Sequence, residues 1–100
     1  MNEIVLLGGA DGDLIELYNG FEDRSLGTGG DFDAAFVKAC DLLARHPEIG
    51  RRYSGEFRRL LMLDWHLGIF YTVTGLRVFI HAIVDVRQDP QQITRRLGAR

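Results

Sequence analysis

The stretch GIFYTVTGLRVFIHAIVDVR, Gly68–Arg87, decides the fold of this 100-residue chain. It holds two runs of alternating side chains separated by Thr74 and Gly75, a pattern typical of a β-hairpin with a tight turn. An earlier run at Phe57–Leu63 leads into it through a reversal at residues 64–67, so the sequence predicts an antiparallel sheet. In the last strand we expect a core face of Leu76, Val78, Ile80, Ala82, Val84 and Val86, and an opposite face of Arg77, Phe79, His81, Ile83, Asp85 and Arg87.

Two amphipathic helices are predicted before this sheet. A short strand at Glu3–Leu7 precedes Asp11, which we expect to be the N-cap of the first helix. After a glycine-rich break at residues 25–30, Asp31 is expected to cap a second helix, which Pro47 ends. Their apolar stripes are Leu14, Leu17, Tyr18 and Phe21 in the first helix, and Phe32, Phe36, Ala39, Cys40 and Leu43 in the second.

A short basic helix is expected near the C-terminus. Asp89 is a good N-cap, Pro90 suits the first helical position, and Gly98 is a typical stop. Ile93 and Leu97 are four residues apart, so they share one face of this helix.

These elements together predict an α+β fold. The order is β-α-α-β-β-β, with the N-terminal helical hairpin packed on a mainly antiparallel sheet and the basic helix at the end. A chain of this length has room for one hydrophobic core, so residues 1–100 are expected to form a single domain.

Charge divides the chain into two halves. Residues 1–44 hold nine acidic and two basic side chains, whereas residues 45–100 hold five acidic side chains and ten arginines, and the formal net charge is −2. Such a bipolar chain suits an acidic or anionic partner on one face and is a poor general ligand for nucleic acids. The chain has no basic signal region and no long apolar run, and its one cysteine, Cys40, fits a reducing compartment. We therefore expect a cytoplasmic protein that does not contact the membrane.

No metal or cofactor site is expected. His46, His66 and His81 lie on different predicted elements, which does not suit a shared metal ion. The glycines at residues 27–30 lack the lysine and hydroxyl side chain of a phosphate loop, and residues 7–12 depart from the dinucleotide-binding pattern.

Five segments have the order and spacing of one known family. They are ADGDLIELY at residues 10–18, LLARHPEIG at 42–50, FRRL at 57–60, IFYTV at 69–73 and VDVRQDP at 84–90. Through them nearly the whole chain resembles the ParE branch of the RelE/ParE toxin superfamily. Family members often carry a histidine and a pair of arginines before the closing Asp-Pro, where this chain has Asp85, Arg87 and Gln88.

The resemblance implies the toxin of a type II toxin–antitoxin pair, as in plasmid stabilisation systems. Such a toxin is neutralised by direct binding of a cognate antitoxin. In the ParE branch it inhibits DNA gyrase, as a protein inhibitor and not as an enzyme, and sequence-specific DNA binding is not expected. Because guanidinium groups pair with carboxylate or phosphate, contacts to the target are expected from Arg59, Arg87, Arg95 and Arg96.

Two alternatives remain open. In the RelE branch the toxin is a metal-independent, ribosome-dependent mRNA endonuclease, and His81, Arg58, Tyr71 and Arg87 would then be the catalytic candidates. The tail after Arg87 has no tyrosine, histidine or lysine to complete acid and base roles, which favours the inhibitor. The other alternative is an inactive, toxin-derived module that still binds an antitoxin.

An antitoxin is expected to dock as an amphipathic helix or as an added strand. More large apolar side chains are present on the predicted sheet and first helix than one helical hairpin covers. We therefore predict that the antitoxin surface includes Phe21, Phe70, Phe79 and Ile83.

Overall fold

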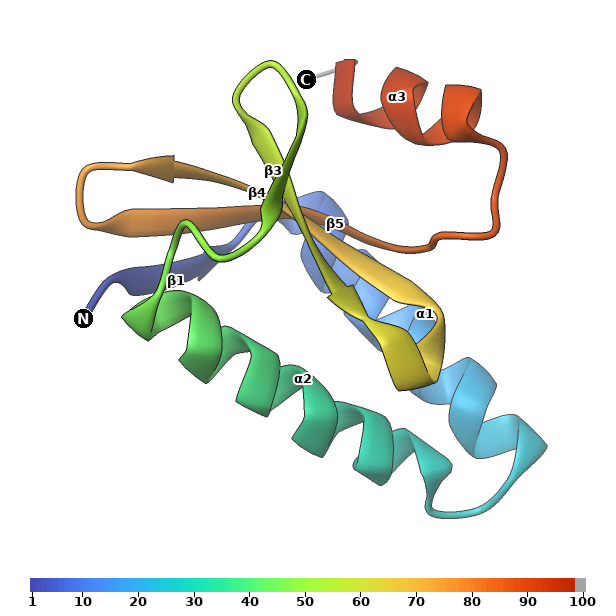
Figure 1. Cartoon of the computed structure of the whole chain (residues 1–100). Helices are drawn as coiled ribbons and strands as arrows, with labels where there is room; N and C mark the ends of the chain where they lie inside the picture. Colours follow the sequence, from blue (N-terminus) through green and yellow to red (C-terminus); the bar gives the residue numbers. More distant parts are fainter. Residues whose placement is uncertain (99–100) are drawn as a thin grey trace.

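A five-stranded sheet separates a hairpin of two long helices from a short C-terminal helix (Figure 1). The computed structural model describes residues 1–98. The sheet order is β1-β5-β4-β3-β2, in which β1 runs parallel to β5 and all other neighbours are antiparallel. The elements are β1 (Glu3–Leu6), α1 (Gly8–Arg24), α2 (Thr28–Arg45), β2 (Arg51–Ser54), β3 (Phe57–Met62), the 3₁₀ turn η1 (Leu63–Trp65), β4 (Leu67–Thr74), β5 (Arg77–Asp85) and α3 (Pro90–Gly98). The predicted α+β fold is confirmed, with the short edge strand β2 in addition to the three strands of the predicted order.

Both long helices begin earlier than the sequence predicts. The N-caps are Leu7 and Gly27, so Asp11 and Asp31 lie in the first helical turns instead of capping them. Gly27 has a left-handed φ of 91°, and its N–H, like that of Gly29, donates to the carboxylate of Glu22 on α1. The Glu22 side chain therefore satisfies backbone donors that a local N-cap would otherwise take, and the glycines that looked like a loop become the start of α2.

The larger core fills the space between the sheet and the hairpin. Phe32 lies at its centre, with ring centroids 5.2 Å from Phe21 and 5.6 Å from Trp65. Cys40 packs against this core, and burial raises the pKa of its thiol to about 11. The fully buried residues here include Ala10, Leu43, Ile69, Tyr71, Val78 and Ile80.

A β-bulge in β5 changes which face its side chains occupy. Tyr71 pairs with Ile80 and Phe70 pairs with Ala82, so His81 is an extra residue in the ladder. Before the bulge, Ile80 faces the hairpin; after it, Ile83 faces the hairpin. The prediction of one continuous core face is therefore wrong beyond Ile80, because one extra residue reverses the alternation. It is also wrong at Leu76, which is 75% exposed in the turn before β5.

The smaller core lies between the sheet and α3. Asp89 caps α3 as predicted, since its carboxylate accepts a hydrogen bond of 3.0 Å from the N–H of Gln91. Ile93 and Leu97 point from α3 onto the sheet and are each 5% exposed. The sheet side of this core consists of Phe57, Phe70, Ala82 and Val84, with Tyr53 packed at its margin.

Within residues 1–98, none of the helices combines the length and the apolar character that a membrane crossing needs.

Candidate functional site

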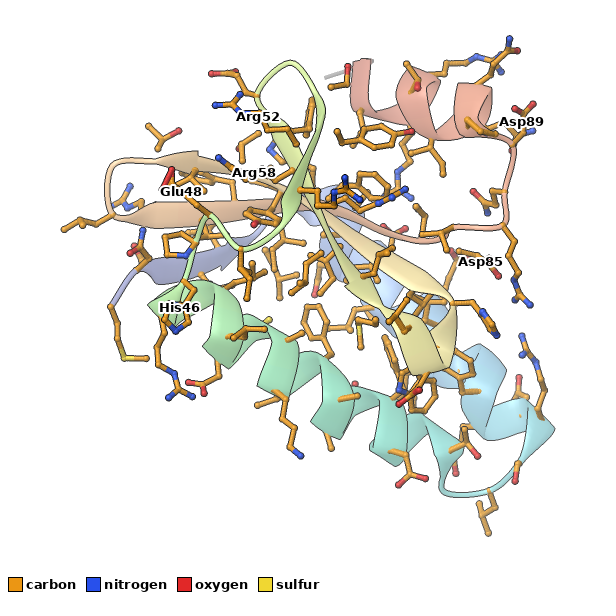
Figure 2. The ribbon with its side chains drawn as sticks, viewed as in Figure 1. His46, Glu48, Arg52, Arg58, Asp85 and Asp89 are labelled. Atoms are coloured by element: carbon orange, nitrogen blue, oxygen red, sulfur yellow. The ribbon has the colours of Figure 1, made fainter. Side chains whose placement is uncertain are left out.

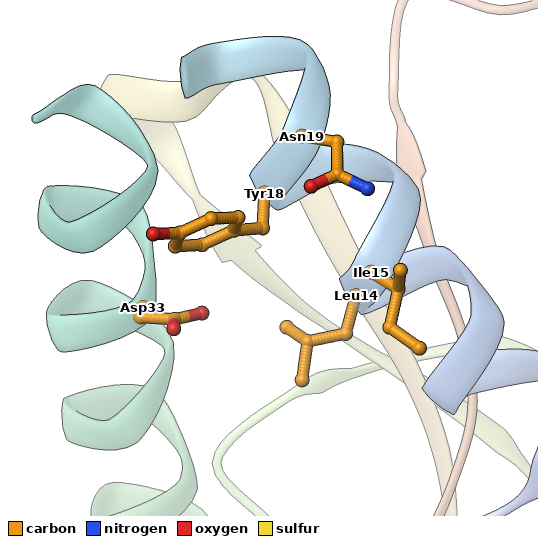
Figure 3. A pocket seen from close by; sticks show the side chains of 5 residues that line it. All are labelled: Leu14, Ile15, Tyr18, Asn19 and Asp33. Carbon is orange, nitrogen blue, oxygen red and sulfur yellow. The ribbon is translucent and has the colours of Figure 1, made fainter. Parts of the chain in front are cut away.

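The outer surface of the helical hairpin carries an apolar pocket. It has a volume of about 260 Å³ and opens between α1 and α2 (Figure 3). Ile15 is 57% exposed there, and Asp33 of α2 places a carboxylate at the rim. Val37, one turn after Asp33, is 65% exposed on the same side of α2. The lining residues are Leu14, Ile15, Tyr18, Asn19 and Asp33.

This pocket was not predicted from the sequence, because an amphipathic pattern identifies the buried stripe of each helix and not a hollow on its outer side. Tyr18 belongs to the predicted stripe of α1, yet its side chain is 36% exposed and reaches the pocket. Ile15 and Val37 lie outside the predicted apolar stripes of α1 and α2. An apolar side chain at a position expected to face solvent is the sequence feature that could have indicated the pocket.

The predicted target-binding arginines lie in three parts of the chain: Arg59 in β3, Arg87 after β5, and Arg95 and Arg96 in α3. Arg59 is half-buried, with its guanidinium 5.6 Å from the Tyr53 ring centroid. Arg96 donates to the Asp13 carboxylate at 2.5 Å and to the carbonyl of Gly9 at 3.2 Å, so it joins α3 to α1. Arg95 is exposed on α3.

The fourth predicted contact, Arg87, is held by its own neighbour. Its side chain donates twice to the Asp85 carboxylate, at 3.0 Å and 2.6 Å, and its backbone N–H donates to the same group at 2.8 Å. These hydrogen bonds lower the pKa of Asp85 to about 2. Asp85 therefore neutralises Arg87 at the position where the resemblance suggested a basic group.

The four residues of the endonuclease hypothesis lie in different places. Tyr71 is buried on the hairpin side, where its hydroxyl accepts a hydrogen bond of 2.8 Å from the N–H of Gly50 and where burial raises its pKa. His81 lies on the α3 side, with its Nε2 2.9 Å from the Thr72 hydroxyl and its ring against Phe57.

Arg58 shares the hairpin face with Tyr71, while Arg87 follows β5 and pairs with Asp85. His81 therefore lies on the opposite face of the sheet from Tyr71 and Arg58, so these three side chains do not share one site. Among residues 1–98, no three histidine, cysteine, aspartate or glutamate side chains are grouped so that they could hold a metal ion.

Two of the four predicted antitoxin contacts are core residues. Phe70 is fully buried beneath α3, and Ile83 is 2% exposed in the hairpin core, so neither presents a surface. The prediction is wrong for these two because it underestimated the cover from α3 and did not foresee the bulge. Phe21 and Phe79 are half-buried, Phe21 against Trp65 and Phe79 opposite Val5 in the sheet.

No family model matches the sequence, and no curated protein matches it. Among solved structures, a chain of the "Chromosomal ParDE TA system from P. aeruginosa" superposes on this one with a TM-score of 0.75. The chain has a ParE-like fold. The superposition covers 85% of this chain and 96% of the other chain, at 17% sequence identity. At this identity the likeness concerns the fold, and it confirms the fold that the resemblance of the sequence implied.

Proposed function

We propose that this protein is the toxin of a type II toxin–antitoxin pair and that it acts as an inhibitor of DNA gyrase. The observation that carries the proposal is the shared fold, which extends over 96% of a chain from the ParDE system. The separation of His81 from Tyr71 and Arg58 by the sheet supports an inhibitor over an mRNA endonuclease.

The cognate antitoxin is proposed to cover the pocket on the hairpin. An amphipathic helix that docks there would bury Ile15 and Tyr18 in its apolar face. Asp33 lines the pocket and Glu16 is exposed on α1, so basic side chains flanking the apolar face of the antitoxin helix would be favoured.

The contact to gyrase is proposed to come from α3 and the segment before it. Arg95 is exposed there, whereas Arg96 is held by Asp13. Arg95 is therefore the arginine of this region that is placed to meet a carboxylate of another protein.

Controlled expression in bacteria tests the function directly. We expect growth arrest that is relieved by co-expression of an antitoxin encoded next to this protein. Purified protein should inhibit supercoiling by gyrase in a gel assay and should leave translated messages intact. Arrest accompanied by cleaved mRNA would instead support the endonuclease, and unaffected growth would support the inactive module.

Matched variants test the two contact surfaces. Ile15→Asp should abolish relief by the antitoxin while toxicity remains, and Leu26→Asp, at a side chain that is 92% exposed away from the pocket, should leave relief unchanged. Arg95→Gln should weaken gyrase inhibition, whereas Arg77→Gln, which removes the exposed partner of Glu3 at the far end of β5, should not. Equal effects within either pair would contradict that assignment.

A further inference from the structure

Four arginines form two cross-strand pairs between the edge strand β2 and its neighbour β3. In the ladder Arg51 pairs with Arg59, and Arg52 pairs with Arg58. Like charges directly opposite one another in a sheet are destabilising. Strand β2 is also the last strand in the sheet order, so no strand within residues 1–98 pairs with its outer side.

The two arginine pairs have different surroundings. Arg58 lies opposite Tyr71, so Arg52 and Arg58 face the hairpin side, where they line a polar hollow with Glu48 and Glu56 (Figure 2 labels Glu48, Arg52 and Arg58). Arg58 also donates to the carbonyl of Gly50 at 2.9 Å and lies 3.8 Å from the Glu48 carboxylate. Arg58 is therefore matched in charge and hydrogen bonding within the protein, and Arg52 lines the same hollow as Glu48 and Glu56.

The other pair has no such match. Arg59 lies opposite Phe70 of the smaller core, so Arg51 and Arg59 face the α3 side. Arg59 is placed over the ring of Tyr53, and within residues 1–98 neither Arg51 nor Arg59 has a carboxylate within ion-pair distance. These two like-charged residues therefore face one another in the ladder without a counter-charge among residues 1–98.

Protection of the sheet edge explains only half of this arrangement. Charged side chains on an edge strand discourage pairing with other chains, which accounts for arginine at 51 and 52. It does not account for Arg59, which lies on the inner strand β3. A ligand that places negative charge between Arg51 and Arg59 accounts for both, because it converts the repulsion into two attractive contacts.

We propose that the outer edge of β2 binds an extended acidic peptide segment as an added strand, with a carboxylate of that segment bound by Arg51 and Arg59. An added strand gains backbone hydrogen bonds from the open edge, and its side chains alternate between the two faces of the sheet. Every second residue of the segment faces the α3 side and is acidic. The residues between them face the hairpin side, where Arg52 lines a hollow together with Glu48 and Glu56. These residues of the segment are neutral.

A peptide fits this surface better than a nucleic acid does. Affinity for nucleic acid comes mainly from continuous phosphate contacts, and here the protein has a net charge of −2 and Glu48 and Glu56 lie beside Arg52 and Arg58 on the other face of the same strands. Planar guanidinium groups also match carboxylates in a two-pronged geometry. The proposal does not depend on whether the protein is a toxin.

Binding of a designed peptide tests the proposal. The probe is a fluorescein-labelled octapeptide of alternating Thr and Glu, compared with the same peptide carrying Gln for Glu, by fluorescence anisotropy. We expect the acidic peptide to bind at least about ten-fold more tightly. The double variant Arg51→Gln/Arg59→Gln should lose about that factor, whereas the matched variant Arg52→Gln should change affinity less than about two-fold. Amide shifts in NMR spectra should be largest at residues 51–54.

The melting temperature of an Arg51 variant shows whether Arg51 serves binding or the stability of the fold. Because Arg51 faces Arg59 without a counter-charge, Arg51→Thr should raise Tm by roughly 1–4 °C while the affinity for the acidic peptide falls. A structural role predicts a lower Tm. Equal affinity for the two peptides, equal losses in the two arginine variants, or tighter binding of the oligonucleotide dT8 than of the acidic peptide would each overturn the proposal.

Discussion

The two faces of the sheet are covered very differently. On one face lie helices of 17 and 18 residues, and on the other a helix of nine residues that contributes two core side chains, Ile93 and Leu97. The hairpin side holds the larger core, so we expect stability to depend more on that side than on the α3 side. The hairpin closes most of the hydrophobic core, while the α3 side leaves sheet residues such as Phe79 and Arg51 partly or wholly accessible.

The largest effect is expected from the hairpin side. Phe32→Ala removes a fully buried ring that contacts Phe21 and Trp65, and it should cost about 3–5 kcal/mol of unfolding free energy. Denaturant unfolding followed by circular dichroism measures this cost. A loss below about 1 kcal/mol would show that the hairpin does not dominate stability.

A smaller and more local effect is expected from the α3 side. Leu97→Ala removes a side chain that is 5% exposed. Large-to-small changes of this type lower the free energy of global unfolding by about 2–5 kcal/mol. Because α3 is terminal and short, we expect part of this cost to appear as local opening. Hydrogen exchange should show faster exchange in α3 with protection retained in α1 and α2. An equal increase in exchange rate in α1, α2 and α3 would contradict the view that the α3 side opens independently of the hairpin side.

A single carboxylate links the two sides. Asp13 on α1 accepts hydrogen bonds from the N–H of Ile83 at 2.9 Å and from Arg96 at 2.5 Å, and its side chain is 12% exposed. Asp13→Ala leaves the Ile83 donor unsatisfied and should cost about 1–3 kcal/mol. The exposed Asp23 is the matched control, since Asp23→Ala should change stability by less than about 0.5 kcal/mol. Equal denaturation midpoints for the two variants would contradict the linking role.

The smallest effect is expected at Asp85, the last residue of β5. Arg87 holds the pKa of its carboxyl at about 2, below the ordinary value of 3.8. A lowered pKa contributes stability above pH 3.8, and this contribution is lost as the pH falls towards 2. In carboxyl-detected NMR titrations, Arg87→Gln should return the pKa of Asp85 towards 3.8. An unchanged midpoint would assign the shift to another group.

The sequence predicted the order of the elements because local signals and packing agree in most of them. The turn at Thr74 and Gly75, the cap at Asp89 and the apolar stripes of α1 and α2 each have a local cause. The start of α2 was predicted too late because a side chain of another helix, Glu22, accepts hydrogen bonds from the N–H groups of Gly27 and Gly29. No local pattern contains that contact. Helix α1 also begins earlier than predicted, without a side-chain cap.

The candidate site was harder to predict than the fold. Burial of Phe70 and Ile83 depends on how far α3 reaches and on the bulge at His81, and both are set by tertiary packing. The charge asymmetry pointed to the arginine-rich second half of the chain, but it did not reveal the pairing of arginines across β2 and β3. Register decides that pairing, and composition does not contain it.

The bulge also makes β5 sensitive to chain length. Strand β5 contributes to both cores, and one extra residue, His81, exchanges the faces that its later side chains occupy. Deletion of His81 would turn Ala82 and Val84 towards the hairpin and Ile83 towards α3. The side-chain volumes would then no longer fit either of the two cores. Replacing the histidine with another side chain keeps the count and is a far milder change. Evolution of this strand is thus constrained more by the number of its residues at this point than by their identity.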